Sequence, residues 1–275
     1  MLKDLCELFR YRELFFTLVQ RDLKARYKRS VLGFFWSLLN PLLQVATLTV
    51  IFKYVIQQRV PITNFAPFLF VAFLPWTFFQ LGLMDASTAV PLNVHILKRV
   101  YFPREILPLA NVASNLVHFL MAMLVLFLYL GVHVRIHFAW DQLLYLPLII
   151  ALQTLLVAGF ALLVSCMSVY FMDVHYIVTV LLNLLYWASC IFYPLYGNEQ
   201  MAGLATSRFA VIAELNTLVP LVTLYRQSIL THSGVPDAGP VQWELLVRVA
   251  VWAFAALAVG YAVFNWRKWE FAERT

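Results

Sequence analysis

Long apolar stretches constrain the fold of this sequence more than any other feature. A helix needs about 20 predominantly apolar residues to cross the hydrocarbon core of a bilayer. Hydrophobic residues make up 63% of the 275-residue chain and charged residues 12%, against about 45–50% and about 25% in soluble domains. We therefore predict one all-α integral membrane domain (1–275) with six transmembrane helices. The predicted spans are residues 32–52, 66–84, 106–131, 143–170, 176–195 and 245–266.

The distribution of Lys and Arg predicts which ends of these helices face the cytoplasm, because cytoplasmic loops are enriched in both. With the N-terminus inside, fourteen of the 20 Lys and Arg residues fall in inner segments and five in outer ones, while Arg248 lies within the last span. We therefore expect the first 31 residues and the tail 267–275 to be cytoplasmic. The net charge of +6 is then mainly a topological signal, which argues against a nucleic-acid partner.

The N-terminal segment joins a basic cluster directly to the first span. Apolar residues between Leu5 and Leu23 recur at helical spacing, which predicts an amphipathic helix lying in the cytoplasmic interface. The Arg and Lys residues from Arg21 to Arg29 would then lie among anionic lipid headgroups. Two interpretations are open: the cluster only anchors the chain, or it also binds the headgroup of a substrate.

The outer segment between the fifth and sixth predicted spans is longer than a turn requires. It contains Glu214, Asn216, Pro220 and Arg226 within an apolar stretch, and a helix exposed to lipid would not tolerate these residues. We predict two short helices there, which dip into the membrane or cap the bundle.

The inner segment between the second and third predicted spans, residues 91–105, predicts a short amphipathic helix that ends at Pro103. Held between two spans, such a helix can transmit a push from a soluble partner; alternatively it rests on the membrane surface. Its apolar side comprises Leu92, Ile96 and Val100, and its polar side His95, Lys98 and Arg99.

Motifs for nucleotide, metal or nucleophilic chemistry are missing from the sequence. GxxxxGK[ST], GxSxG and HExxH do not occur, so we expect no cofactor or metal in this chain and no enzymatic activity. The opposing hypothesis is a membrane transferase that uses Asp173, His175 or His118 for acid–base chemistry. It would need these groups at one membrane depth, whereas His118 falls within a span and Asp173 in an inner turn. Asp85, at the inner end of the second span, is not expected to have a special role.

Polar and aromatic residues inside the spans admit a structural and a functional interpretation. Asn40 and Gln44 in the first span would be costly against lipid, so they either hydrogen-bond neighbouring helices or line a polar translocation path. Tyr186, Tyr193 and Tyr196, near the outer end of the fifth span, either belong to the interfacial aromatic belt or offer ring faces to sugars.

Five short motifs follow one another along the chain. They are "RYKRSVLGFFWSLLNPL" (26–42), "VYFPREILPLA" (100–110), "DVHYIV" (173–178), "IFYPL" (191–195) and "FNWRKWEFAERT" (264–275). In this order they resemble the membrane subunit of bacterial ABC exporters of polysaccharides, the group that moves O-antigen, teichoic acid or capsule chains.

The resemblance implies a homodimer in the bacterial inner membrane that binds two copies of a separate cytoplasmic ATPase, where ATP and Mg²⁺ would be held. The implied cargo is a polyprenyl-pyrophosphate-linked polysaccharide such as an O-antigen; a smaller lipid or a drug is the alternative. The helix of the inner segment would then be the coupling helix. Its implied contacts with the ATPase are Leu92, Ile96, Lys98, Arg99, Tyr101, Phe102 and Arg104.

The resemblance also implies that the basic cluster lies at a substrate entrance. Its cations would meet the pyrophosphate, because Arg and Lys bind phosphate groups. The following Leu-Gly pair would shape the cytoplasmic mouth, and the tryptophan would stack on the first sugars. The entrance residues are Arg26, Lys28, Arg29, Leu32, Gly33 and Trp36.

Overall fold

The regular elements of this chain are helices in the computed structural model, which describes residues 10–27, 35–51, 64–95, 102–134, 138–192, 216–231, 235 and 238–268. No strand occurs in these residues, which confirms the all-α prediction for them. In chain order the elements are α2 (Arg12–Tyr27), α3 (Phe35–Val50), α4 (Phe65–Ala89), η2 (Pro91–Asn93), α6 (Ile106–Tyr129), η3 (Leu130–Val134), α7 (Trp140–Leu143), α8 (Leu146–Tyr170), α9 (Val174–Ala188), α12 (Leu218–Leu230) and α13 (Trp243–Arg267).

Four helical segments are long and apolar enough to cross a membrane, and they correspond to the second, third, fourth and sixth predicted spans. They are Phe65–Ala89, Ile106–Val132, Trp140–Tyr170 and Trp243–Arg267. For the first predicted span, the structure describes the 16 residues of α3, while residues 32–34 and 52 lie outside the described ranges.

The fifth predicted span is shorter than expected. α9 has 15 residues and ends at Ala188 instead of residue 195, so it is about 22 Å long at 1.5 Å per residue and stops short of the far side of the bilayer. The chain turns at Cys190, whose φ of 53° is the left-handed conformation that ends many helices. α12, with 13 residues, is also too short to span. It is one of the two short helices predicted for the outer segment; most of residues 196–215 lie outside the described ranges.

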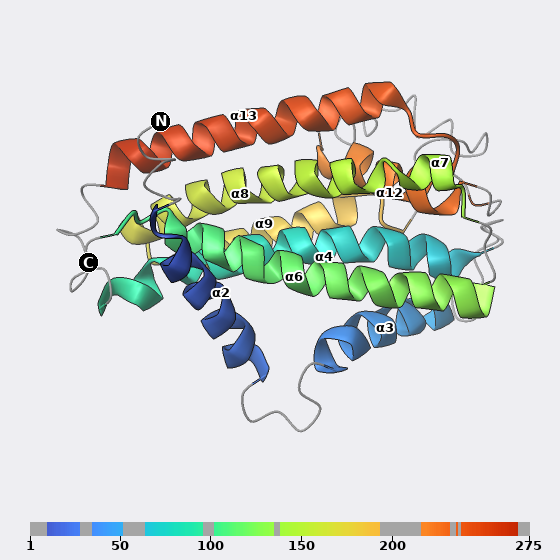
Figure 1. Cartoon of the computed structure of the whole chain (residues 1–275), viewed down its shortest axis with the longest axis horizontal. Helices are drawn as coiled ribbons and strands as arrows, with labels where there is room; N and C mark the ends of the chain where they lie inside the picture. The colour runs from blue at the N-terminus through green and yellow to red at the C-terminus, as the bar shows by residue number, and fades with distance from the viewer. Residues whose placement is uncertain are drawn as a thin grey trace.

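The long helices run beside one another along the long axis of the molecule (Figure 1). α8 packs most extensively on α13, while α4 contacts α3, α6, α8, α9 and α12. The residues of α4 from Pro67 to Trp76 are all buried, so α4 is the central helix of the bundle. α2 lies at one end of the molecule and α12 toward the other (Figure 1).

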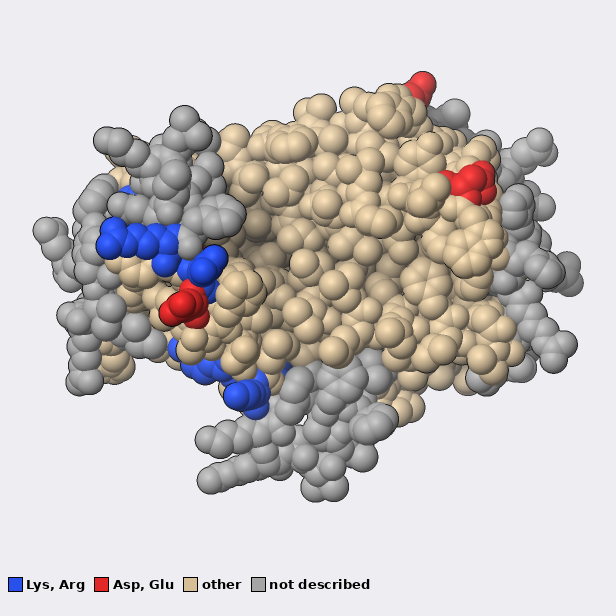
Figure 2. Space-filling model, viewed as in Figure 1, with Lys and Arg blue, Asp and Glu red and all other residues tan. Residues whose placement is uncertain are grey.

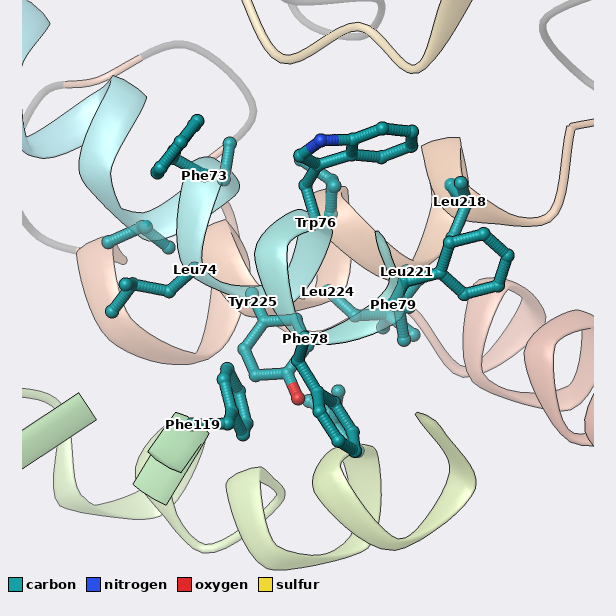
Figure 3. Packing of buried hydrophobic residues seen from close by; sticks show 14 of the residues in the cluster. Phe73, Leu74, Trp76, Phe78, Phe79, Phe119, Leu218, Leu221, Leu224 and Tyr225 are labelled. Atoms are coloured by element: carbon teal, nitrogen blue, oxygen red, sulfur yellow. The ribbon is translucent and has the colours of Figure 1, made fainter. Parts of the chain in front are cut away.

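Aromatic rings fill the core around α4, and one chain of polar contacts crosses it. Phe78 stacks on Phe119 of α6 with 5.1 Å between the ring centroids, and Tyr225 of α12 meets Phe119 edge-on (Figure 3). The Tyr225 hydroxyl donates to Gln153 Oε1 of α8 (2.6 Å), and Gln153 Nε2 donates to the carbonyl oxygen of Pro75 (2.8 Å). These buried polar groups satisfy one another and thereby join α12, α8 and α4.

Two glycines allow α8 and α13 to cross in close contact. A Cβ atom at Gly159 would overlap the backbone of Ala256 and Leu257, and one at Gly260 would overlap the backbone of Gly159. Small residues at such crossings let membrane helices associate through van der Waals packing of their backbones. The crossing therefore fixes the last span against the fourth.

Candidate functional site

The predicted interface helix is present as α2, and an apolar face holds it against the bundle. Leu18 and Val19 are buried in a cluster with Ile106 and Leu107 at the start of α6. Arg26 follows Val19 by two helical turns. The packing of α2 therefore carries the Arg26 side chain to α4 and α6.

Arg26 meets a carboxylate and an amide from two different helices. Its Nη2 contacts Asp85 Oδ2 of α4 and donates to Asn115 Oδ1 of α6 (2.8 Å). Asn115 Nδ2 donates to the same carboxylate oxygen (2.8 Å), and Asn111 Nδ2 donates to the backbone carbonyl of Asp85 (3.1 Å). The Arg26 and Asp85 side chains are 31% and 35% exposed. Three helices thus meet at one ion pair that remains accessible.

The guanidinium of Arg26 keeps further binding capacity. Both contacts use Nη2, and Nε and Nη1 have no hydrogen-bond partner among the described residues. A guanidinium carries five donors in a planar fork that matches the geometry of phosphate. Arg26 can therefore hold Asp85 and an oxyanion at the same time.

A pocket of about 340 Å³ opens beside this ion pair, between α2, the end of α4 with η2, and α6. Across the pocket, Arg21 Nη1 donates to Asn93 Oδ1 (2.9 Å) and Arg21 Nη2 lies 2.9 Å from Asp22 Oδ1. Because these groups orient one another, the pocket is preorganised. Its polar lining includes Arg21, Asp22, Arg26, Asp85, Asn93 and Ser114.

Basic side chains gather at the end of the molecule where α2 lies. Figure 2 shows the visible Lys and Arg gathered at this end, with one acidic group beside them, while the visible charged residues at the opposite end are acidic. Among the described residues, this end carries the cations of α2, Arg104 before α6, and Arg267 and Lys268 at the end of α13. Such an asymmetry is typical of the cytoplasmic ends of spans.

The structure describes the side chain of only one predicted entrance residue, Arg26. Trp36 belongs to α3, but its side chain is not among those described. The other predicted entrance residues, Lys28, Arg29, Leu32 and Gly33, lie outside the described residues.

The structure describes the side chains of two residues of the predicted translocation path, Gln44 and Tyr186. Gln44 is exposed on α3, while Asn40 lies on the same helix without a described side chain. Tyr186 is half-buried in an aromatic cluster. Its ring centroid lies 5.4 Å from that of Trp76 and 5.2 Å from that of Phe192. Tyr193 and Tyr196 lie outside the described residues.

The predicted coupling segment begins with the short turn η2. Leu92 is 76% exposed there, whereas Phe102 is buried in the cluster that holds α2. Phe102 therefore joins the segment to α2 and offers little surface to a partner. Four predicted coupling residues between Leu92 and Phe102 lie outside the described residues: Ile96, Lys98, Arg99 and Tyr101.

Two residues at the end of this segment join it to α13. Glu105 is 1% exposed, and its Oε1 lies 3.0 Å from Lys268 Nζ. Arg104 Nη1 contacts the backbone carbonyl oxygen of Lys268. A buried carboxylate is costly unless it is paired, so this ion pair ties the start of α6 to the end of α13.

A second arginine lies at the other end of the bundle, where α9 stops. Arg226 of α12 is fully buried, and its Nη2 donates to the carbonyl oxygens of Cys190 (3.1 Å) and Ile191 (2.9 Å). Its guanidinium carbon lies 3.6 Å from the centre of the Phe68 ring. Asn216 Nδ2 donates to the carbonyl oxygen of the last α9 residue (3.3 Å). Asn216, just before α12, thus supplies a partner for a carbonyl that the end of α9 leaves without one. Arg226 of α12 does the same for two carbonyls of the turn that follows, where lipid could not.

The residues of the transferase hypothesis are not gathered into one site. Asp173 is exposed, and His175 Nδ1 lies 2.8 Å from Ser87 Oγ. His118 is twelve residues into α6, which places it about 18 Å along that helix. Within the described ranges, no group of three or more His, Cys, Asp or Glu residues is placed to hold a metal ion.

Comparisons with known proteins match almost the whole chain. The model of the ABC-2 type transporter family matches residues 13–225. The O-antigen export system permease protein RfbA of Myxococcus xanthus is 33% identical over 273 residues, 99% of each chain. A protein of the same name from Klebsiella pneumoniae is 29% identical over 264 residues, 95% of this chain and 94% of that one. The polysialic acid transport protein KpsM of Escherichia coli is 22% identical over 257 residues, 90% of this chain and 91% of its own.

Proposed function

The chain belongs to the ABC-2 family of transporter membrane proteins, and we propose that it is the transmembrane subunit of an ATP-driven exporter of a polyprenyl-pyrophosphate-linked polysaccharide. The observation that carries this proposal is the end-to-end similarity to the O-antigen permease of Myxococcus xanthus, 33% identical over 99% of both chains. In this role the chain is a transport subunit and no enzyme, because a separate subunit hydrolyses ATP.

The ion pair at α2 supports a substrate entrance at this end of the bundle. Arg26 has donors that contact no described residue, and it is the predicted entrance residue whose side chain the structure describes. We assign it to the pyrophosphate together with Lys28 and Arg29, with Leu32, Gly33 and Trp36 forming the mouth. Sugars would then pass Asn40 and Gln44 toward the tyrosines near the end of α9.

The partner is a cytoplasmic ATPase that holds ATP and Mg²⁺ and binds the segment that begins at η2. The exposed Leu92 suits a contact with such a partner. Since Glu105 joins the end of this segment to Lys268, movement of the segment would pull on α13 as well as on α6. Two ATPase copies would serve two copies of this chain.

We place the second copy of the chain against α9. α9 is too short to cross the bilayer alone, so covering its outer end with protein would relieve the mismatch with the lipid. Its exposed apolar residues include Ile177, Val180, Leu184 and Trp187. Leu184→Cys, in a variant without the native cysteines, should form a disulfide-linked dimer in membranes. Leu124→Cys on the exposed face of α6 is the control that should stay monomeric.

We propose that the end that carries α2, Arg104 and Lys268 faces the cytoplasm, because cytoplasmic ends of spans are enriched in Lys and Arg. The chain would then lie in the bacterial inner membrane with both termini inside.

A pull-down in mild detergent tests the proposed function. The tagged chain is purified from its own cells, and the recovered partners are identified and assayed for ATP hydrolysis. Recovery of a Walker-type ATPase at equal stoichiometry is the expected result, together with loss of surface polysaccharide when the chain is deleted.

The contrary result would be a chain that purifies alone and whose deletion leaves surface polysaccharide intact. Loss of function in Asp173→Ala with His175→Ala, with assembly and partner ATPase turnover intact, would favour the transferase hypothesis instead.

A further inference from the structure

Two exposed side-chain amides lie midway along the bundle, Gln80 on α4 and Asn183 on α9. Gln80 precedes the last residue of α4 by nine residues, and Asn183 follows the first residue of α9 by nine. Each therefore lies about 14 Å from the inner end of its helix, near the middle of a hydrocarbon core that is about 30 Å thick. An amide that faced lipid at this depth would be costly, so both amides need a polar neighbour.

The register of α4 against α9 brings these two amides to the same level. Three side-chain contacts set this register, and they join Ser87 to His175, Met84 to Thr179, and Trp76 to Tyr186. The helices are antiparallel, since earlier residues of α4 meet later residues of α9. Gln80 lies midway between the last two of these positions on α4, and Asn183 lies between the matching positions on α9. The two amides are therefore neighbours along one α4–α9 seam.

A hydrogen bond fixes the orientation of the Gln80 amide. Trp76 Nε1 donates to Gln80 Oε1 (3.1 Å), and Trp76 is 3% exposed. Because an indole N–H can only donate, the amide oxygen is turned toward the buried ring and the amide nitrogen away from it. No hydrogen bond joins Gln80 Nε2 or the Asn183 side chain to another described residue. The seam therefore offers the donors of Gln80 beside a donor and an acceptor of Asn183.

Sugar hydroxyls match this set of groups, because each hydroxyl both donates and accepts hydrogen bonds, whereas acyl chains do neither. The second copy of the chain is the competing occupant, and we place it against the exposed apolar face of α9. Asn183 follows His175 and Thr179 at four-residue spacing, and these two contact α4, so Asn183 lies on the side of α9 that faces α4. Ile177 and Leu184, seven residues apart, share a different face. The amides are therefore left beside that contact, open to a polar cargo.

We propose that Gln80 and Asn183 form a sugar-binding step midway across the membrane, where hydroxyl groups of the passing glycan exchange water for side-chain amides. Both groups are uncharged, so each hydrogen bond is weak enough to release the sugar again. Tyr186, about one turn further out on α9, meets the sugar next. The inference rests on the proposed function, because it names residues that contact the exported glycan.

Cysteine labelling of the full chain in lipid vesicles with its ATPase partner tests this step. Gln80→Cys and Asn183→Cys, each made without the native cysteines, are treated with a membrane-impermeant methanethiosulfonate. Ala258→Cys is the matched control, because Ala258 is exposed on α13 and lies nine residues from the end of that helix, at the same depth. Both seam cysteines should react about tenfold faster than the control, since a thiol must ionise to react and hydrocarbon opposes this.

A polyprenyl-pyrophosphate-linked glycan extracted from the same cells is then added. It should slow labelling of both seam cysteines about tenfold at about ten times its dissociation constant, whereas polyprenyl pyrophosphate without sugars should not. Asn183→Leu and Gln80→Leu should each slow export of the glycan lipid about two- to tenfold, the equivalent of one hydrogen bond. Asn183→Gln should retain most of the export rate, and Ala258→Leu should leave it unchanged.

Three results would overturn the proposal. Seam cysteines that react no faster than Ala258→Cys would show that the seam faces lipid. Spontaneous disulfide-linked dimers of Asn183→Cys would assign the seam to the second copy. Equal protection by the sugar-free lipid would assign it to the polyprenyl carrier. A wild-type complex whose ATP hydrolysis ignores the glycan lipid would contradict the proposed function itself, whereas a complex that responds while both cysteines stay unprotected would refute the sugar contact alone.

Discussion

Two arginines at opposite ends of the bundle meet the rest of the chain in different ways. Arg26 is partly exposed, uses one nitrogen to contact Asp85 and Asn115, and borders a pocket. Arg226 is fully buried, and it contacts backbone carbonyls and the ring of Phe68. An arginine with donors to spare beside a pocket can bind a ligand, whereas an enclosed one stabilises the fold. The surroundings of the cation, more than its presence in a membrane segment, indicate which role it has.

Replacing the buried arginine is the strongest test of this difference between the two arginines. Arg226→Met removes the partners of two buried carbonyl groups, and we expect a loss of about 2–4 kcal/mol, because each buried acceptor left unsatisfied costs about 1–3 kcal/mol. The measurement is thermal unfolding of the detergent-solubilised chain. Arg248→Met, at an exposed arginine of α13, is the control. A variant as stable as that control would show that the Arg226 contacts contribute nothing.

Arg26→Gln should leave the stability of the chain nearly unchanged and reduce export. The glutamine amide can still reach toward Asp85, so we expect thermal unfolding close to that of the wild type. Export should fall about tenfold, because the charge-assisted contact with phosphate is gone. Surface polysaccharide in cells carrying the variant measures export. If Arg26→Gln unfolds as easily as Arg226→Met, the two arginines share a structural role and the comparison fails.

Asp85→Asn tests how much the carboxylate contributes to holding α2. Because both side chains are about one third exposed, the ion pair should be worth about 1 kcal/mol or less. A double-mutant cycle of Asp85→Asn with Arg26→Gln, followed by thermal unfolding, measures this coupling directly. Asp173→Asn, at an exposed aspartate, is the matched control. Coupling above about 3 kcal/mol would contradict the solvent-accessible geometry, since values of that size belong to buried pairs.

A last, local effect concerns the turn beside Arg226. Cys190 has a left-handed backbone, which costs a residue with a Cβ about 1–2 kcal/mol and costs glycine little. Cys190→Gly should therefore be more stable than Cys190→Ala, both variants having lost the same sulfur. Equal melting temperatures of the two variants would mean that this turn relaxes without cost.

Local properties of the sequence were sufficient to predict four spans and the interface helix. Apolar length and helical spacing can be read from neighbouring residues, so the helices corresponding to 66–84, 106–131, 143–170 and 245–266 were found. The early end of α9 was not predicted, because Arg226, which hydrogen-bonds the turn after this helix, is 36 residues further along the chain than Cys190. Non-local contacts of this kind have no local pattern.

The candidate site could be predicted only in part for the same reason. Arg26 was assigned from its basic cluster, but Asp85 was given no special role, since a carboxylate at a span end is ordinary. Its partners Arg26 and Asn115 are 59 and 30 residues away. A useful signal was present in the composition: Asp85 is the one charged residue of α4, and an isolated charge in a span needs a partner.

Substrate-stimulated ATP hydrolysis is the measurement that tests the central claim most directly. The chain and its ATPase partner are reconstituted in lipid vesicles, and hydrolysis is measured with and without a polyprenyl-pyrophosphate-linked glycan. The account expects the glycan lipid to stimulate hydrolysis and to appear on the far side of the membrane in proportion to the ATP consumed. Hydrolysis that ignores the glycan lipid and responds to a small lipid or drug would contradict it.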